Sequence, residues 1–140
     1  MRKTIECNTT VDPVEGMSES DRPIVIEFEN GLVVDGVLDR VKGPLIVEEI
    51  MHRLPIIGRA VVMGSEMRIT LGIGRGNLKA ARDLKRGEIA YMPLGDSLCI
   101  YLDDTRSPTP VNPLGRVISD HLLDTLRDVR RGARVTIRPG

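Results

Sequence analysis

The chain has 140 residues, a formal net charge of zero, two tyrosines, one phenylalanine and no tryptophan. A chain of this length is expected to form one domain, and its core must be built from aliphatic side chains. Interspersed acidic and basic residues argue against a nucleic-acid-binding protein, which needs a cationic face and rings on which bases stack.

Residues 1–22 are interpreted as an N-terminal lead-in, and residues 23–140 as the folded domain. Residues 8–22 contain Ser, Glu, Asp, Gly and Pro and show little periodicity, so the lead-in is expected to be partly mobile. An extra edge strand at Lys3 to Glu6 is the alternative. No apolar signal region follows the first basic residues, and no run reaches the length of a membrane span, so a cytoplasmic protein is expected.

The two cysteines, Cys7 and Cys99, lie far apart in the sequence. Cys99 lies within an apolar run and is expected to behave as a small buried hydrophobe. One pair of cysteines does not form the framework of a secreted disulfide scaffold, although a Cys7–Cys99 disulfide stays open.

The first elements are predicted from Pro23 onward. Alternating apolar residues on either side of Asn30-Gly31 predict a hairpin ending at Leu38, because Asn-Gly accepts the positive φ angles of a tight turn. Residues 44–54 predict an amphipathic helix that starts at Pro44 and is stopped by Pro55. Two further strands are expected on either side of Gly64-Ser65.

The second half of the chain is predicted to contain mostly strands. Residues 74–86 are ambiguous between a helical turn and an irregular strand. Residues 88–92 and 97–102 predict a strand pair around the Pro-Leu-Gly-Asp turn at 93–96. The proline-rich segment after this pair is interpreted as a connection, and a short strand is expected at 114–118.

The end of the chain predicts one more helix and one more strand. The helix is expected from Ser119 or Asp120 to Gly132, and the strand at 133–139. Many short strands with turn signals between them and only two helices favour an antiparallel barrel or sandwich.

Two segments resemble a known family. GEIAYMPLGDSLCIYL, at 87–102, and TPVNPLGRVI, at 109–118, are similar to the cyclophilin-like family of prokaryotic proteins of unknown function. The resemblance extends over residues 23–139 and implies a closed eight-stranded antiparallel barrel capped by two short helices, as in peptidyl-prolyl isomerases. The matching positions are Gly87, Glu88, Tyr91, Pro93, Gly95, Asn112, Gly115, Arg116 and Val117.

The resemblance also implies where isomerase chemistry would lie. Arg68 is the candidate for the catalytic arginine, and the alternative is a solvated strand arginine paired with Glu66. The places of the family's glutamine and phenylalanines are taken by Leu98, Cys99 and Ile100, and that of its histidine falls near Val111 or Asn112.

A peptide or a small apolar ligand is the expected partner, held in a shallow cleft. Tyrosine hydroxyls would orient the ligand, whereas the alternative is that both tyrosines pack in the barrel wall. The candidate ligand-binding residues are Met63, Tyr91, Met92, Leu98, Ile100, Tyr101 and Asn112.

A binding module without efficient isomerase activity is therefore the expected function. The alternative is a peptidyl-prolyl cis-trans isomerase that uses Arg68, and a third possibility is a homo-oligomeric structural domain. The oligomeric state is left open.

Other motifs predict no cofactor and no metal. GIGRGN at 72–77 lacks the spacing of a dinucleotide-binding loop. His52 and His121 have no second ligand at metal-binding spacing. Asp103 and Asp104 are interpreted as turn-initiating residues, and neither nucleic acid nor a membrane is an expected partner.

Overall fold

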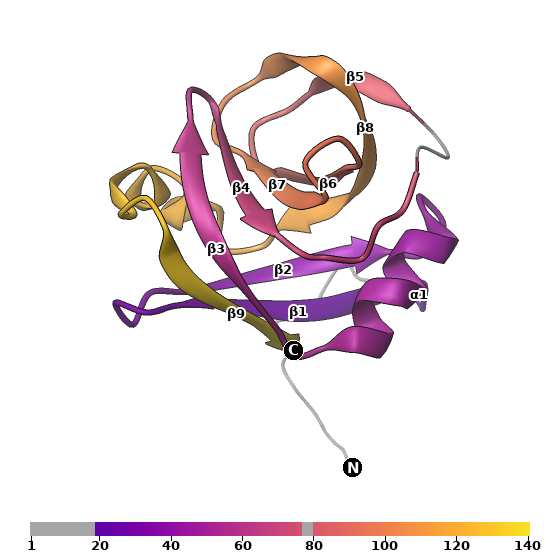
Figure 1. The fold of residues 1–140 in the computed structure, drawn as a ribbon, viewed down its shortest axis with the longest axis horizontal. Helices are drawn as coiled ribbons and strands as arrows, with labels where there is room; N and C mark the ends of the chain where they lie inside the picture. Colours follow the sequence, from indigo (N-terminus) through magenta and orange to yellow (C-terminus); the bar gives the residue numbers. More distant parts are fainter. Residues whose placement is uncertain (1–18, 77–79) are drawn as a thin grey trace.

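The hairpin predicted around Asn30-Gly31 forms the first two strands of a closed barrel (Figure 1). The computed structural model describes residues 19–76 and 80–140, so Cys7 and the edge strand expected at Lys3 to Glu6 lie outside the described residues. The elements are β1 (Asp21–Phe28), β2 (Val33–Asp39), α1 (Pro44–Arg53), β3 (Ile56–Met63), β4 (Glu66–Thr70), β5 (Ala81–Leu84), β6 (Glu88–Met92), β7 (Ser97–Tyr101), β8 (Thr105–Val117), the 3-10 helices η1 (Asp120–Leu122) and η2 (Thr125–Asp128), and β9 (Ala133–Pro139).

Eight antiparallel strands close on themselves, in the order β2-β1-β9-β3-β4-β7-β6-β8, because β8 also pairs with β2. The fifth strand, β5, is an addition that pairs with β8 alone among the described strands. The prediction of a closed, mainly β, eight-stranded barrel is therefore confirmed, with one strand more than expected. Closure leaves fewer unpaired edges on which another chain could add a strand.

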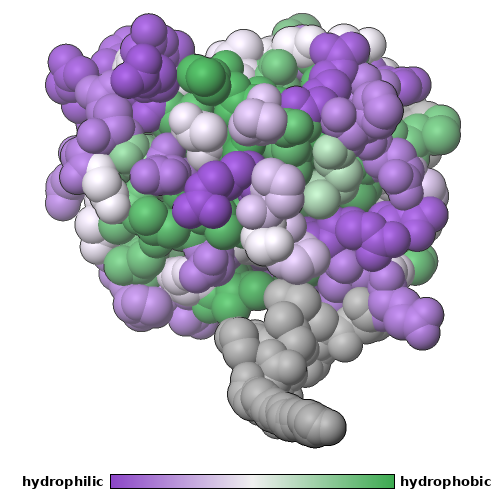
Figure 2. Space-filling model, turned by 90° about the horizontal axis from the view of Figure 1, so that it is seen from below, coloured by the Kyte–Doolittle hydropathy of each residue, from purple (hydrophilic) through white to green (hydrophobic). Residues whose placement is uncertain are grey.

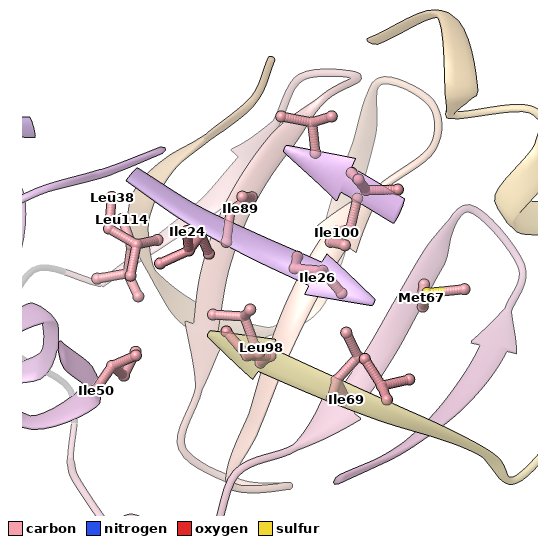
Figure 3. Packing of buried hydrophobic residues seen from close by; sticks show 14 of the residues in the cluster. Ile24, Ile26, Leu38, Ile50, Met67, Ile69, Ile89, Leu98, Ile100 and Leu114 are labelled. Carbon is pink, nitrogen blue, oxygen red and sulfur yellow. The ribbon is translucent and has the colours of Figure 1, made fainter. Parts of the chain in front are cut away.

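The barrel interior is filled by aliphatic side chains from every barrel strand (Figure 3). Alternation places Ile24 and Ile26 of β1, and Leu98 and Ile100 of β7, in this one core. The side chains of α1 that join it are Ile46, Val47 and Ile50. In Figure 1, α1 and the two 3-10 helices lie on opposite sides of the barrel, so the two ends are covered by different segments.

The prediction of a second α-helix near the end of the chain is wrong, because this segment forms 3-10 helices. Residues 120–128 form two short 3-10 helices, and Leu123 and Leu126 are buried in the barrel core. Leu123, Leu126 and Val129 recur every three residues, which matches the three residues per turn of a 3-10 helix. The backbone bonds from Leu126 N to Leu123 O and from Val129 N to Leu126 O have this tighter spacing.

The interpretation of the proline-rich segment as a connection is also wrong, because most of this segment belongs to β8. This strand has 13 residues and includes Pro108, Pro110 and Pro113. Prolines are tolerated at irregularities, where no ladder hydrogen bond is needed from the nitrogen. The register of β8 shifts against β5 between residues 106 and 111, and against β6 between Pro113 and Gly115.

Two ambiguous regions are resolved by strand pairing. The segment left open between a helical turn and a strand contains β5, which pairs with Thr105 and Arg106 of β8. Strand β1 includes Asp21 and Arg22, which precede the expected domain start at residue 23 and pair with Asp39 and Leu38 in the first hairpin.

Barrel closure depends on a position without a side chain. Gly115 of β8 pairs with Leu38 of β2, and a Cβ atom there would lie 1.8 Å from the carbonyl oxygen of Val37. Real Cβ atoms do not approach backbone oxygens this closely, so any other residue would push β8 away from β2.

We expect Gly115→Ala to lower the free energy of unfolding by roughly 3 kcal/mol, because the strands must separate to admit one methyl group. Urea unfolding followed by circular dichroism measures the change. Gly76→Ala is the matched control, since a Cβ at Gly76 meets nothing within 4 Å. Equal stability of the two variants would contradict the tight closure.

Candidate functional site

The wall formed by β6 and β7 is buried on both of its faces. Its inward side chains belong to the main core, and its outward side chains belong to a second, smaller cluster. We call β5 together with residues 105–111 of β8 the arch, because in Figure 1 this part of the chain curves over the wall from outside. The second cluster consists of Ala90, Met92, Cys99 and Tyr101 from the wall and Leu84 and Val111 from the arch.

The predicted ligand-binding residues are divided between these two faces. Tyr91, Leu98 and Ile100 lie inside the barrel with 0% of their surface exposed, whereas Met92 and Tyr101 belong to the second cluster. The division follows from the two-residue period of a strand, which sends neighbouring side chains to opposite faces. No single cleft therefore contains all the predicted residues.

The other two predicted ligand-binding residues lie at the borders of the wall. Met63, at the end of β3, is 47% exposed and pairs with Glu66 of β4. Asn112 of β8 is buried and pairs with Tyr91 of β6. Met63 is thus the accessible member of the predicted set.

Four chemically active side chains lie together on the outer face of β4 and β7. Glu66 pairs with Tyr101, and Arg68 pairs with Cys99, across these two strands. We call these four residues the outer polar cluster. Alternation against Met67, Ile69 and Ile100, which are in the main core, places all four on the outside of the barrel.

The Arg68 guanidinium is bound by a carboxylate. Its Nε donates a hydrogen bond of 2.8 Å to Glu66 Oε2, and the Arg68 side chain keeps 26% of its surface exposed. This hydrogen bond is the main cause of a raised Arg68 pKa, so the side chain stays charged. The ion pair that was the alternative for Arg68 is present, on the face that leads to the second cluster.

Cys99 and Tyr101 are the fully buried members of the outer polar cluster. Burial, followed by the negative charge of Glu66, raises the pKa of the Cys99 thiol to about 12. Burial also raises the pKa of Tyr101. Within the described part of the chain the Tyr101 hydroxyl has no nitrogen or oxygen partner, and its polar neighbour is the Cys99 thiol, a weak hydrogen-bonding group. A buried hydroxyl without a partner is costly, so this atom is a candidate for contact with a ligand.

A second polar arrangement fixes the turn between β6 and β7. Asp96, whose φ is +49°, accepts hydrogen bonds at Oδ1 from the Tyr91 hydroxyl at 2.6 Å and from the amides of Ile73 and Gly74. The Tyr91 hydroxyl in turn accepts the amide of Arg75 at 3.1 Å. This arrangement ties the glycine-containing loop to the turn and explains why Tyr91 lies beside the Pro-Leu-Gly-Asp sequence.

The pKa values of this pair follow from its hydrogen bonds. Burial and the hydrogen bond to Asp96 raise the pKa of Tyr91 to about 12. Burial alone would raise the pKa of Asp96, but the hydrogen bonds from Tyr91, Gly74 and Ile73 outweigh it and lower that pKa. Asp96 was not among the predicted site residues, although Asp in a turn after Gly is a recognisable signal of left-handed backbone.

Other surfaces offer less specific chemistry. A pocket of about 280 Å³ beside α1 is lined by Leu45, Glu48, Glu49, His52 and Arg75. Within residues 19–76 and 80–140, no group of three or more metal-ligating side chains is present, so His52 and His121 do not form such a cluster. The face seen in Figure 2 carries hydrophilic and hydrophobic residues interspersed.

None of the helices in the described residues is long and apolar enough to cross a membrane. Cys99 is a free thiol.

Comparison with known proteins agrees with this architecture. The family model described as Cyclophilin-like matches residues 22–138, so the chain belongs to the cyclophilin-like family. No curated protein sequence matches the chain.

Solved structures show the same fold. The solution structure of the hypothetical protein AF2241 from Archaeoglobus fulgidus aligns with a TM-score of 0.71 and 22% identity, covering 89% of this chain and 99% of that one. The structure of McbB in complex with tryptophan aligns with a TM-score of 0.66 and 18% identity, covering 82% of this chain. The aligned region spans 44% of the McbB chain.

The two buried tyrosines allow a matched test of these hydrogen bonds. Tyr91→Phe removes a hydroxyl that bonds Asp96 and Arg75, so we expect a loss of about 2 kcal/mol in the free energy of unfolding. Tyr101→Phe removes a hydroxyl that has no nitrogen or oxygen partner in the described chain and only the weakly bonding Cys99 thiol beside it, so its stability should stay within about 0.5 kcal/mol of the wild type or rise. Urea unfolding of both variants measures this, and equal losses would contradict the assignment.

The lowered pKa of Asp96 predicts that the free energy of unfolding depends on pH in the acidic range. A carboxyl whose pKa is lower in the folded state stabilises the fold above its unfolded pKa, near 3.8, and loses this contribution as the pH falls through the folded value. We therefore expect Asp96→Asn to be less stable than the wild type at pH 7, and the difference to shrink below pH 3.8. Unfolding measured across this pH range tests it, and a difference independent of pH would refute it.

Proposed function

We propose that this member of the cyclophilin-like family is a binding module for a peptide or a small ligand, without efficient prolyl isomerase activity. The observation that carries the proposal is the state of Arg68 on the outer face of the barrel. Its guanidinium is held by Glu66 at 2.8 Å yet stays partly exposed, and Glu66 pairs across β3 and β4 with Met63, whose side chain is exposed. This combination offers a polar and an apolar contact to a ligand at the same place.

Two features argue against efficient isomerisation. Rotation about a prolyl bond has a barrier of about 20 kcal/mol, which an enzyme lowers by donating to the prolyl amide while it grips the ring. Arg68 already donates to Glu66, so its field at a substrate amide is partly neutralised. All three aromatic side chains, Phe28, Tyr91 and Tyr101, are buried, and none can grip a proline ring at the surface.

A prolyl isomerase that uses Arg68 is the alternative function. The observation that favours it is the placement of a strand arginine on the outside of a cyclophilin-like barrel, with 26% of its side chain exposed. Strand arginines that only form ordinary ion pairs are far more common than catalytic arginines, so this alternative ranks second.

A protease-coupled isomerisation assay on a blocked Ala-Ala-Pro-Phe peptide separates the two functions. We expect the wild type and Arg68→Ala to show the same rate as the uncatalysed reaction. A rate above background in the wild type that is lost in Arg68→Ala would establish the isomerase instead.

Binding is tested with the same peptide by nuclear magnetic resonance titration. We expect shift changes at Met63 and Arg68, and weaker binding by Arg68→Ala. The matched control is Arg138→Ala, because Arg138 is also a strand arginine, paired with Glu27 at 3.4 Å on another face of the barrel. Equal weakening by both variants, or no binding by the wild type, would refute the proposed module.

A further inference from the structure

The arch is held on the barrel wall by few contacts. The main core has members from every barrel strand, whereas the arch contributes only Leu84 and Val111 to the second cluster of the described residues. Residues 105–111 of β8 pair with β5 and with no wall strand in the described chain, and β8 joins the wall at Asn112. The arch can therefore separate from the wall while the eight-stranded barrel stays closed.

One base of the arch is anchored by hydrogen bonds. The backbone amide of Arg86 donates to Asp104 Oδ1 at 2.8 Å. The guanidinium groups of Arg86 and Arg127 both donate to the carbonyl oxygen of Leu102, and Arg127 also binds Asp103 at 2.7 Å. These bonds fix the chain where it leaves β7, so a hinge lies at this base and the movable part lies beyond it.

The side chains under the arch include polar groups that gain nothing from being covered. The Tyr101 hydroxyl and Thr109 Oγ1 are both buried without a hydrogen-bond partner within the described residues. A closed core that served only stability would pair these atoms or replace them with apolar ones. These two hydroxyls, one in the wall and one in the arch, both lack a nitrogen or oxygen partner, and we take this as support for a second state of the interface.

The outer face is continuous from the open part to the covered part. Met63 pairs with Glu66, and Glu66 pairs with Tyr101, so an exposed side chain leads in two steps to the buried hydroxyl. Arg68 lies in the next row and pairs with Cys99. A ligand that enters beside Met63 would reach Tyr101 once the arch is raised.

We infer that the arch is a lid over an extension of the binding face, and that the Tyr101 hydroxyl donates a hydrogen bond to a carbonyl oxygen of the bound ligand. The site takes an extended peptide or a similar amide: its carbonyl meets Tyr101, and its aliphatic side chains replace Leu84 and Val111 against Met92 and Ala90. The choice of ligand rests on the proposed function, whereas the movement of the lid does not.

Cys99 reports on the lid because it lies beneath the arch and is fully buried. In a Cys7→Ser background, the rate of labelling by dithionitrobenzoate gives the free energy of the opening that exposes Cys99. We expect labelling at least tenfold faster than global unfolding allows, as measured by urea. Leu84→Ala should increase the rate further, because it removes half of the apolar contact of the arch.

The matched control is a thiol on the opposite face of the same strand. Ile100→Cys, in a Cys7→Ser and Cys99→Ser background, places the thiol in the main core, so labelling there should require global unfolding. If this variant does not fold, hydrogen exchange of β5 amides against β9 amides in the wild type gives the same comparison. Labelling of Cys99 no faster than global unfolding allows, or equal protection of the β5 and β9 amides from exchange, would refute the proposal that the arch is a lid.

The ligand contact is tested by Tyr101→Phe with the blocked Ala-Ala-Pro-Phe peptide. We expect about tenfold weaker binding with unchanged stability, since the variant removes only the donor. Equal affinity of the variant and the wild type would overturn the hydrogen bond to the ligand. Absence of binding by the wild type would overturn both the proposed function and this ligand, and the lid would still be decided by the labelling of Cys99.

Discussion

The contact between β2 and β8 at Gly115 determines the architecture, because it closes the sheet. Without a side chain at this position the strands approach closely enough for Gly115 to pair with Leu38 of β2 and Ile89 of β6. The interior then becomes a single core that one helix and two 3-10 helices cover. The same strand, β8, continues beyond the barrel and forms half of the arch, so one long strand both closes the core and covers the outer face.

Much of the fold could be predicted from local sequence signals. The hairpin at Asn30-Gly31, the helix started by Pro44 and the strand at residues 133–139 each depend on short-range chemistry, and the structure confirms them. The end of strand β8 matches the short strand expected at 114–118, whereas residues 105–113 could not be predicted, because their prolines are normally signals of a loop and are accommodated here by irregular pairing that only the folded partners supply. The 3-10 helices were missed because apolar residues three apart also suit one side of an α-helix.

The site was harder to predict than the fold, and the reason lies in β6 and β7. A strand buried on both faces is apolar throughout, so its sequence does not show which side chains point outward. Leu98 and Ile100 therefore seemed equivalent to Met92 and Tyr101, although they lie inside the barrel. The outward position of Arg68 could be predicted because β4 keeps an alternating pattern, and its partner Glu66 lies two residues away on the same face. The Asp96 arrangement depends on contacts with residues 73–75, which no local pattern reveals.

The position of β9 has a consequence for how the protein is made. This last strand lies between β1 and β3 in the sheet, so the first and second hairpins have no direct contact through the ladder until it arrives. A ribosome-bound chain that lacks residues 133–139 can form local hairpins but cannot assemble the cylinder. The barrel can thus close only after residues 133–139 have been synthesised, and pairings between residues so distant in sequence make this closing step slow.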